Sequence, residues 1–134
     1  MGIDPVAFAA GIAPQLRRMR LLVAVRMGEM WPPQLARQLA TLDQMAGGRL
    51  MINIISSGLP GQVMEPAARY RRTLEIMGVL RDLLDGESVE FHGEFLDLAL
   101  DPPRLRPAGG CPPFYFGGLS EPAREVAARP LTCT

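Results

Sequence analysis

Apolar residues form three short continuous runs along the chain, at positions 21–25, 50–55 and 114–116. Each run has the length of a β-strand and ends at a loop. Continuous apolar runs of this kind are typical of strands that are covered on both faces, as in a parallel sheet. The pattern therefore predicts three buried strands.

Between the first and second runs, and again after the second, the apolar positions take helical spacing. Residues 34–45 carry one apolar stripe, which consists of Leu35, Leu39, Leu42 and Met45. Residues 67–84 carry a second apolar face, made of Leu74, Met77, Leu80, Leu83 and Leu84. Glycines follow both stretches, as is common at helix ends. We predict two long amphipathic helices.

Three shorter elements complete the pattern. A helix is expected over residues 6–16, with Asp4 as its N-cap, and another is expected to begin near Ser120. Residues 89–98 alternate between apolar and polar on both sides of a turn near His92-Gly93, which indicates a β-hairpin.

Strands and helices therefore alternate along most of the chain. Such an order predicts an α/β protein in which right-handed crossovers join the strands of a parallel sheet. We treat residues 1–134 as a single domain. The pattern fits an open doubly wound sheet as well as part of a barrel.

Composition excludes several classes of function. The 14 basic residues, all arginines, balance 14 acidic residues, so there is no positive surplus for nucleic acid. No apolar run approaches the roughly 20 residues that span a membrane. The start lacks a signal-peptide pattern. Cys111 and Cys133 have neither metal-site spacing nor the look of a disulfide framework, so we expect a reducing cytoplasm and no metal site.

Candidate chemistry lies in the loops after the strands, because sites in parallel α/β folds form at the carboxyl ends of strands. Residues 116–120 run from a strand through two glycines to a helix start, which can cradle a phosphate. A tight turn with an ordinary serine cap explains the same residues. Tyr70 can reach a phosphate from the next helix or lie on the surface, and Arg26 can be a site cation or pair with a carboxylate. His92, the single histidine, has no catalytic partner in the sequence.

Several segments together resemble the luciferase-like flavin-dependent monooxygenases, especially the alkanesulfonate branch. The resemblance rests on the order and spacing of residues 33–49, 50–58, 68–70, 89–95 and 112–120. It implies a partial (β/α)₈ barrel with about three parallel strands, flanking helices and a hairpin excursion. It also implies reduced FMN from a separate NAD(P)H-dependent flavin reductase, and the O₂-dependent conversion of an alkanesulfonate to an aldehyde and sulfite.

Carried onto this chain, the resemblance implies that Tyr70 and Ser120 contact the FMN phosphate and that Gly118 and Leu119 contribute backbone groups. Glu29 aligns near a flavin contact that is often threonine in the family. The family's catalytic groups near the substrate have no counterpart here, so the catalytic residues are unknown.

Family members are more than twice as long as this chain. Residues 129–134 depart from the family's pattern, and we hypothesise a frameshifted or truncated gene. Two alternatives stay open. One is a non-catalytic α/β fragment that binds phosphate or flavin. The other is a related monooxygenase with another substrate, such as nitrilotriacetate or a dibenzothiophene. We expect a homo-oligomer if the chain folds.

Overall fold

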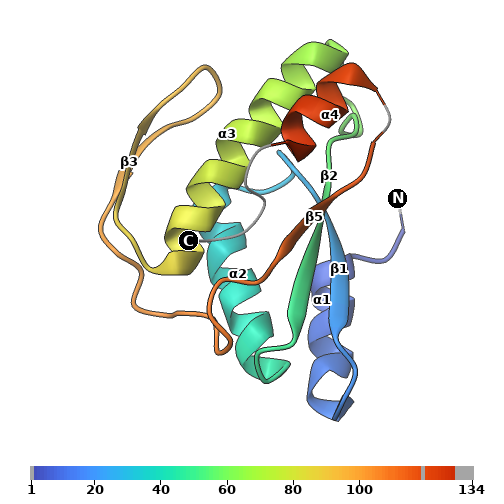
Figure 1. The fold of residues 1–134 in the computed structure, drawn as a ribbon, viewed down its shortest axis with the longest axis vertical. Helices are drawn as coiled ribbons and strands as arrows, with labels where there is room; N and C mark the ends of the chain where they lie inside the picture. The colour runs from blue at the N-terminus through green and yellow to red at the C-terminus, as the bar shows by residue number, and fades with distance from the viewer. Residues whose placement is uncertain (1, 119, 129–134) are drawn as a thin grey trace.

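A computed structural model describes residues 2–118 and 120–128. The elements follow the expected order of strand and helix, with a hairpin before the last strand (Figure 1). In chain order they are α1 (Pro5–Ile12), the 3₁₀ helix η1 (Ala13–Gln15), β1 (Leu21–Arg26), α2 (Pro32–Met45), β2 (Leu50–Ile55), α3 (Pro66–Asp85), β3 (Val89–His92), β4 (Asp97–Leu100), β5 (Phe114–Phe116) and α4 (Glu121–Ala127).

The three predicted strands form one parallel sheet in the order β1-β2-β5. Leu21 lies opposite Leu50 at the start of the sheet, and Ile54 lies opposite Phe116 near its end. Because the strands are parallel, the residues that follow each of them meet at one edge. The sheet thus gathers the three candidate loops on the same side of the molecule.

The predicted bounds agree with the structure for β2 and β5 and nearly so elsewhere. α2 begins two residues earlier than predicted, at Pro32, because a proline fits the first helical turn, where its missing N–H is not needed. The first predicted helix divides after Ile12, since Pro14 interrupts it and a 3₁₀ turn follows. Asp4 caps α1 as expected, with Oδ1 accepting from the Ala7 N–H at 2.7 Å.

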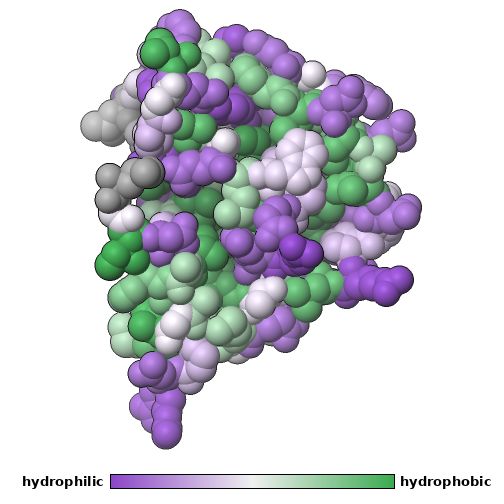
Figure 2. All heavy atoms as spheres, turned by 180° about the vertical axis from the view of Figure 1, so that it is seen from behind, coloured by the Kyte–Doolittle hydropathy of each residue, from purple (hydrophilic) through white to green (hydrophobic). Residues whose placement is uncertain are grey.

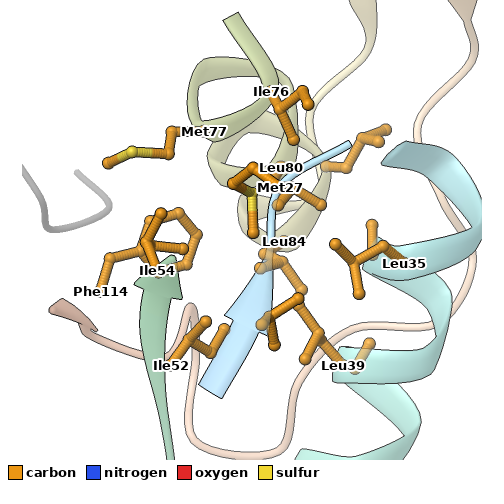
Figure 3. Close-up of a cluster of buried hydrophobic side chains, with 14 of the residues drawn as sticks. Met27, Leu35, Leu39, Ile52, Ile54, Ile76, Met77, Leu80, Leu84 and Phe114 are labelled. Atoms are coloured by element: carbon orange, nitrogen blue, oxygen red, sulfur yellow. The ribbon is translucent and has the colours of Figure 1, made fainter. Parts of the chain in front are cut away.

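The core lies between the sheet and the helices α2 and α3, which run side by side on one side of it (Figure 1). Figure 3 shows leucines of α2 and α3 meeting Ile52, Ile54 and Phe114 of the sheet. Three residues of the predicted α2 stripe are buried, whereas Met45 is 39% exposed. The prediction for Met45 is wrong because the stripe drifts around the helix and leaves its last turn at the rim.

The opposite face of the sheet is not covered by described residues. Exposure alternates along β1 and β2, and Leu22 and Tyr115 on the open face are 54% and 47% exposed. The expectation of strands covered on both faces, which rested on the continuous apolar runs, is therefore wrong within the described residues. Figure 2 shows one face of the molecule, on which hydrophobic and polar side chains are intermixed.

Two carboxylates, one buried and one half-buried, hold loops against the helices by accepting hydrogen bonds from backbone N–H groups. Asp43 of α2 is 1% exposed and accepts from the N–H groups of Leu50 and Gly109, each at 3.0 Å. Glu75 of α3 accepts from three successive N–H groups of the hairpin turn, at residues 94–96. The hairpin β3-β4 consequently lies against α3 rather than extending the sheet.

Candidate functional site

A cleft of about 200 Å³ lies at the carboxyl edge of the sheet, between the ends of β2 and β5 and the start of α3. Its lining is more polar than apolar, which distinguishes it from the gaps between helices. The lining residues are Asn53, Ile54, Ile55, Ser56, Ser57, Tyr70, Phe116 and Gly117. Asn53 of β2 is half-buried and lines this cleft.

Tyr70 and Ser120 come together at one end of this cleft, although 50 positions separate them in the chain. The Tyr70 Oη and the Ser120 Oγ are 3.2 Å apart, within hydrogen-bond distance. The Tyr70 ring packs edge-on against Phe116, with ring centroids 6.2 Å apart and an angle of 72° between planes. This contact orients the phenol along the end of β5, so two hydroxyls converge on one spot.

The two glycines after β5 have different roles. A Cβ on Gly118 would stand 2.5 Å from the Cβ of Ala123, so glycine is required there for α4 to pack closely. A Cβ on Gly117 would meet nothing within 4 Å, which leaves room beside the cleft. Ser120 caps α4, since its Oγ accepts from the Ala123 N–H at 3.4 Å. Leu119 lies outside the described residues.

The turn and cap interpretation of residues 116–120 is therefore correct for Gly118 and Ser120, yet it does not account for the Tyr70 contact. The Ser120 Oγ keeps a second lone pair and a rotatable proton beyond its role as cap. Glu121 adds a negative charge in the first turn of α4. The helix end alone is therefore a weak anion site, and the two hydroxyl groups are the donors that an anion would meet here.

Arg69 precedes the cleft residue Tyr70 in α3. Its Nη1 lies 3.3 Å from where a Cβ on Gly58 would stand, so the guanidinium reaches across to the loop after β2. The Arg69 Nε and the Ser57 Oγ are buried and have no hydrogen-bond partner within the part of the chain that the structure describes. Ser57 lines the cleft, so a ligand bound there would offer its hydroxyl group a partner.

Sequence reasoning missed one polar side chain at the base of this cleft. Thr73 is 1% exposed, and its Oγ1 lies 2.8 Å from the Ser56 Oγ and 2.9 Å from the Arg69 carbonyl oxygen. It thereby fixes the orientation of Ser56, which lines the cleft. A single threonine inside a helix pattern carries no signal for such a role, because helical threonines commonly bond the preceding turn.

Glu29 lies apart from the Tyr70 and Ser120 pair. It follows β1 and forms an exposed ion pair with Arg26, with 2.8 Å between Oε1 and Nη1. Both residues lie at the carboxyl edge, but Glu29 lines a different cavity, next to Trp31, which is 54% exposed. Its predicted contact with the flavin stays a prediction, and the carboxylate that pairs with Arg26 is exposed rather than buried.

His92 lies on the exposed hairpin, away from the cleft. Its Nδ1 lies 2.8 Å from Asp97 Oδ1, and this hydrogen bond together with the carboxylate charge raises the pKa of His92 above 6.5. On the neighbouring turn, the hydrogen bond from Arg71 lowers the pKa of Glu94. These shifts belong to the hairpin and involve no residue of the cleft.

Two further observations concern the expectations from composition. Cys111 is disulfide-bonded, which the interpretation of an isolated cysteine pair did not anticipate. Among the described residues, no helix is both long and apolar enough to cross a bilayer.

The family described as luciferase-like monooxygenase matches residues 1–131, which is nearly the whole chain. The chain therefore belongs to the luciferase-like monooxygenase family, which is a family of enzymes. This confirms the family that the sequence resemblance indicated.

Two curated relatives carry the same name. A sulfoquinovose monooxygenase of Novosphingobium aromaticivorans is 55% identical over 96% of this chain and 38% of its own length. A sulfoquinovose monooxygenase of Agrobacterium fabrum is 42% identical over 94% of this chain and 34% of its own length. This chain thus spans about a third of the curated relatives that it matches.

Solved structures share the fold. The EDTA monooxygenase from Chelativorans sp. BNC1 has a TM-score of 0.86, with 22% identity over 97% of this chain and 36% of its own. The long-chain alkane monooxygenase has a TM-score of 0.81, with 22% identity over 94% of this chain and 36% of its own. These likenesses identify the fold of the chain as part of a (β/α)₈ barrel. The alternative of an open doubly wound sheet is therefore ruled out.

Proposed function

We propose that this chain carries the phosphate end of a reduced-FMN site in a flavin-dependent monooxygenase that acts on an organosulfonate. The observation that carries the proposal is the convergence of Tyr70 and Ser120, whose hydroxyl oxygens are 3.2 Å apart at the carboxyl edge of the sheet. Both residues are those that the family resemblance assigns to the FMN phosphate, and they come from elements far apart in sequence.

The residues present fit the phosphate end of the cofactor. Two hydroxyls at this separation can donate to different oxygens of one phosphate, and hydrogen bonds to a charged acceptor are about twice as strong as neutral ones. Gly117 leaves open space beside them, and the Arg69 guanidinium lies at the neighbouring loop. The cleft of about 200 Å³ holds a phosphate with part of a ribityl chain, and the flavin rings need further walls.

In this proposal the bound flavin supplies the oxygen chemistry, and the protein binds, orients and excludes water. Tyr70 and Ser120 hold the phosphate, and Phe116 keeps the phenol in place through its edge-on contact. Reduced flavin comes from a separate NAD(P)H-dependent reductase, and O₂ and the sulfonate are the other substrates. The products are an aldehyde and sulfite.

The names of the relatives support the proposed substrate class. Both curated relatives are named for sulfoquinovose, a sulfonated sugar, which favours a sulfonate over the aminocarboxylate or thiophene alternatives. We propose sulfoquinovose as the first substrate to test and a simple alkanesulfonate as the second. Sulfite release by the protein with reductase, NADH, FMN and O₂ distinguishes the two, and release from neither would contradict the organosulfonate proposal.

The cofactor proposal is tested by titrating the chain with FMN and with riboflavin, which lacks the phosphate, and following flavin fluorescence. We expect tighter binding of FMN. Tyr70→Phe and Ser120→Ala should each weaken FMN binding roughly tenfold and leave riboflavin binding unchanged, since each removes one hydrogen bond to the phosphate.

The matched controls are Tyr115→Phe, on the open sheet face, and Ser88→Ala, on the exposed loop before β3; both should leave FMN binding unchanged. Equal affinities for FMN and riboflavin, or equal effects of all four substitutions, would contradict the assignment of the phosphate site.

A further inference from the structure

Arg72 is a buried arginine that has no carboxylate partner among the described residues. It lies on the inner side of α3 and is only 8% exposed. Its Nη1 donates to the Gln62 Oε1 at 2.8 Å, its Nη2 lies 3.5 Å from the Met27 carbonyl oxygen, and its Nε is buried with no partner. All of its partners among the described residues are neutral, so the guanidinium charge is not balanced by any of them.

Two carboxylates in the neighbourhood of Arg72, one on the same helix and one at the same cavity, have other partners. Glu75, one turn further along α3, has both oxygens bonded to N–H groups of the hairpin turn. Glu29 lines the same cavity as Arg72 but forms its ion pair with Arg26. A guanidinium stays charged at ordinary pH, so it cannot escape the cost of burial by losing its proton.

A cavity of about 270 Å³ opens against this arginine at the end of β1. Most of its wall is apolar or backbone, formed by Gly28, Met30, Trp31, Pro32, Ile76, Phe95 and Leu96. Gly28 has a φ of +98°, and a Cβ there would lie 2.7 Å from the Arg72 Cζ. The glycine therefore lets the guanidinium lie flat against the loop backbone, beside the cavity.

We propose that Arg72 and the loop 28–32 form a binding site for a small organic oxyanion, separate from the Tyr70 and Ser120 pair. The charge matches a sulfonate or carboxylate group, which accepts from a planar guanidinium fork. The apolar wall fits a short carbon chain or ring attached to that group. The site does not depend on flavin, so it stands or falls independently of the proposed function.

The site is tested by titrating the chain, without flavin, with methanesulfonate, acetate and inorganic sulfate at constant ionic strength. Calorimetry should detect saturable binding of methanesulfonate or acetate with a Kd on the order of 1 mM or tighter. Arg72→Met should weaken that binding at least tenfold. The matched control Arg71→Met removes the same charge from the exposed side of the same helix and should leave binding unchanged.

The outcome in the unsubstituted chain decides the case even if Arg72→Met does not fold. NMR of the arginine Nε–H groups, with the Arg72 signal assigned by its loss in Arg72→Lys, should show a saturable shift of that signal with methanesulfonate. No shift, or binding that Arg71→Met reduces equally, would overturn the proposal. Binding that arises only in Glu29→Gln would also overturn it, because Glu29 itself would then be the anion that Arg72 holds.

Discussion

At the scale of single residues, His92 makes the stability of the exposed hairpin depend on pH. Its imidazole lies between Asp97, at 2.8 Å, and Glu90, whose Oε1 is 3.7 Å from Nε2. Both carboxylates favour the protonated ring, so the pKa of His92 is raised in the folded protein. The hairpin is therefore stabilised most fully at pH values below 6.5, the ordinary value, and this contribution is lost as pH rises through the raised pKa.

We expect an NMR titration of His92 to give a pKa above 6.5 in the folded chain. Asp97→Asn should bring the pKa back toward the ordinary value, because the first and largest cause of the shift is the Asp97 hydrogen bond. Asp101→Asn, just beyond the hairpin, serves as the control and should change little. An unshifted His92 in the parent chain would contradict the hydrogen bond.

Some residues of the candidate sites could be predicted from the sequence and others could not. Tyr70 and Ser120 were predicted to lie together because the family resemblance assigns both to one phosphate, whereas the residues alone left a surface tyrosine and an ordinary serine cap open. Arg72 was not predicted, since burial of an arginine depends on Gly28 and Gln62 approaching it from two other loops. Glu29 was predicted from alignment alone, and its ion pair with Arg26 depends on a local turn that no periodicity describes.

At the scale of elements, α3 acts as the support for both candidate sites and for the hairpin. Three neighbouring residues of this helix point to different places. Tyr70 lines the cleft, Arg72 lines the cavity, and Thr73 bonds Ser56 in the loop after β2. Glu75 follows one turn later and holds the hairpin turn by three hydrogen bonds from N–H groups. The bounds of strands and helices were predictable from the spacing of apolar residues and from capping residues. The different contacts that these residues of α3 make were not predictable in this way.

Replacing Glu75 tests the attachment of the hairpin to α3. Glu75→Ala leaves the three N–H groups at residues 94–96 without their acceptor, and we expect the free energy of unfolding to fall by about 2 kcal/mol. Hydrogen exchange at those amides should accelerate more than exchange in β2. Glu87→Ala, an exposed glutamate just after α3, is the control; an equal loss of stability there would contradict the specific role of Glu75.

At the scale of the whole molecule, the sheet is covered on one face only within the described residues. The chain spans about a third of its curated relatives, and all the helices that pack on the sheet cover the face opposite Leu22 and Tyr115. Apolar runs in the sequence indicated strands with two covered faces, which fits a barrel interior closed by further strands. The open face thus explains why the pattern predicted more burial than this chain achieves.

An exposed apolar sheet face and unpaired strand edges favour association. We expect the isolated chain to bind the dye ANS and to elute from a sizing column above the monomer mass. Leu22→Gln combined with Tyr115→Gln should lower ANS fluorescence severalfold and shift the chain toward monomer, because both side chains lie on the open face. Phe8→Gln, on α1 and 55% exposed, removes a comparable apolar surface away from the sheet and should have a smaller effect. A monomeric parent chain that does not bind ANS would mean that the open face is covered in solution by something other than a second copy.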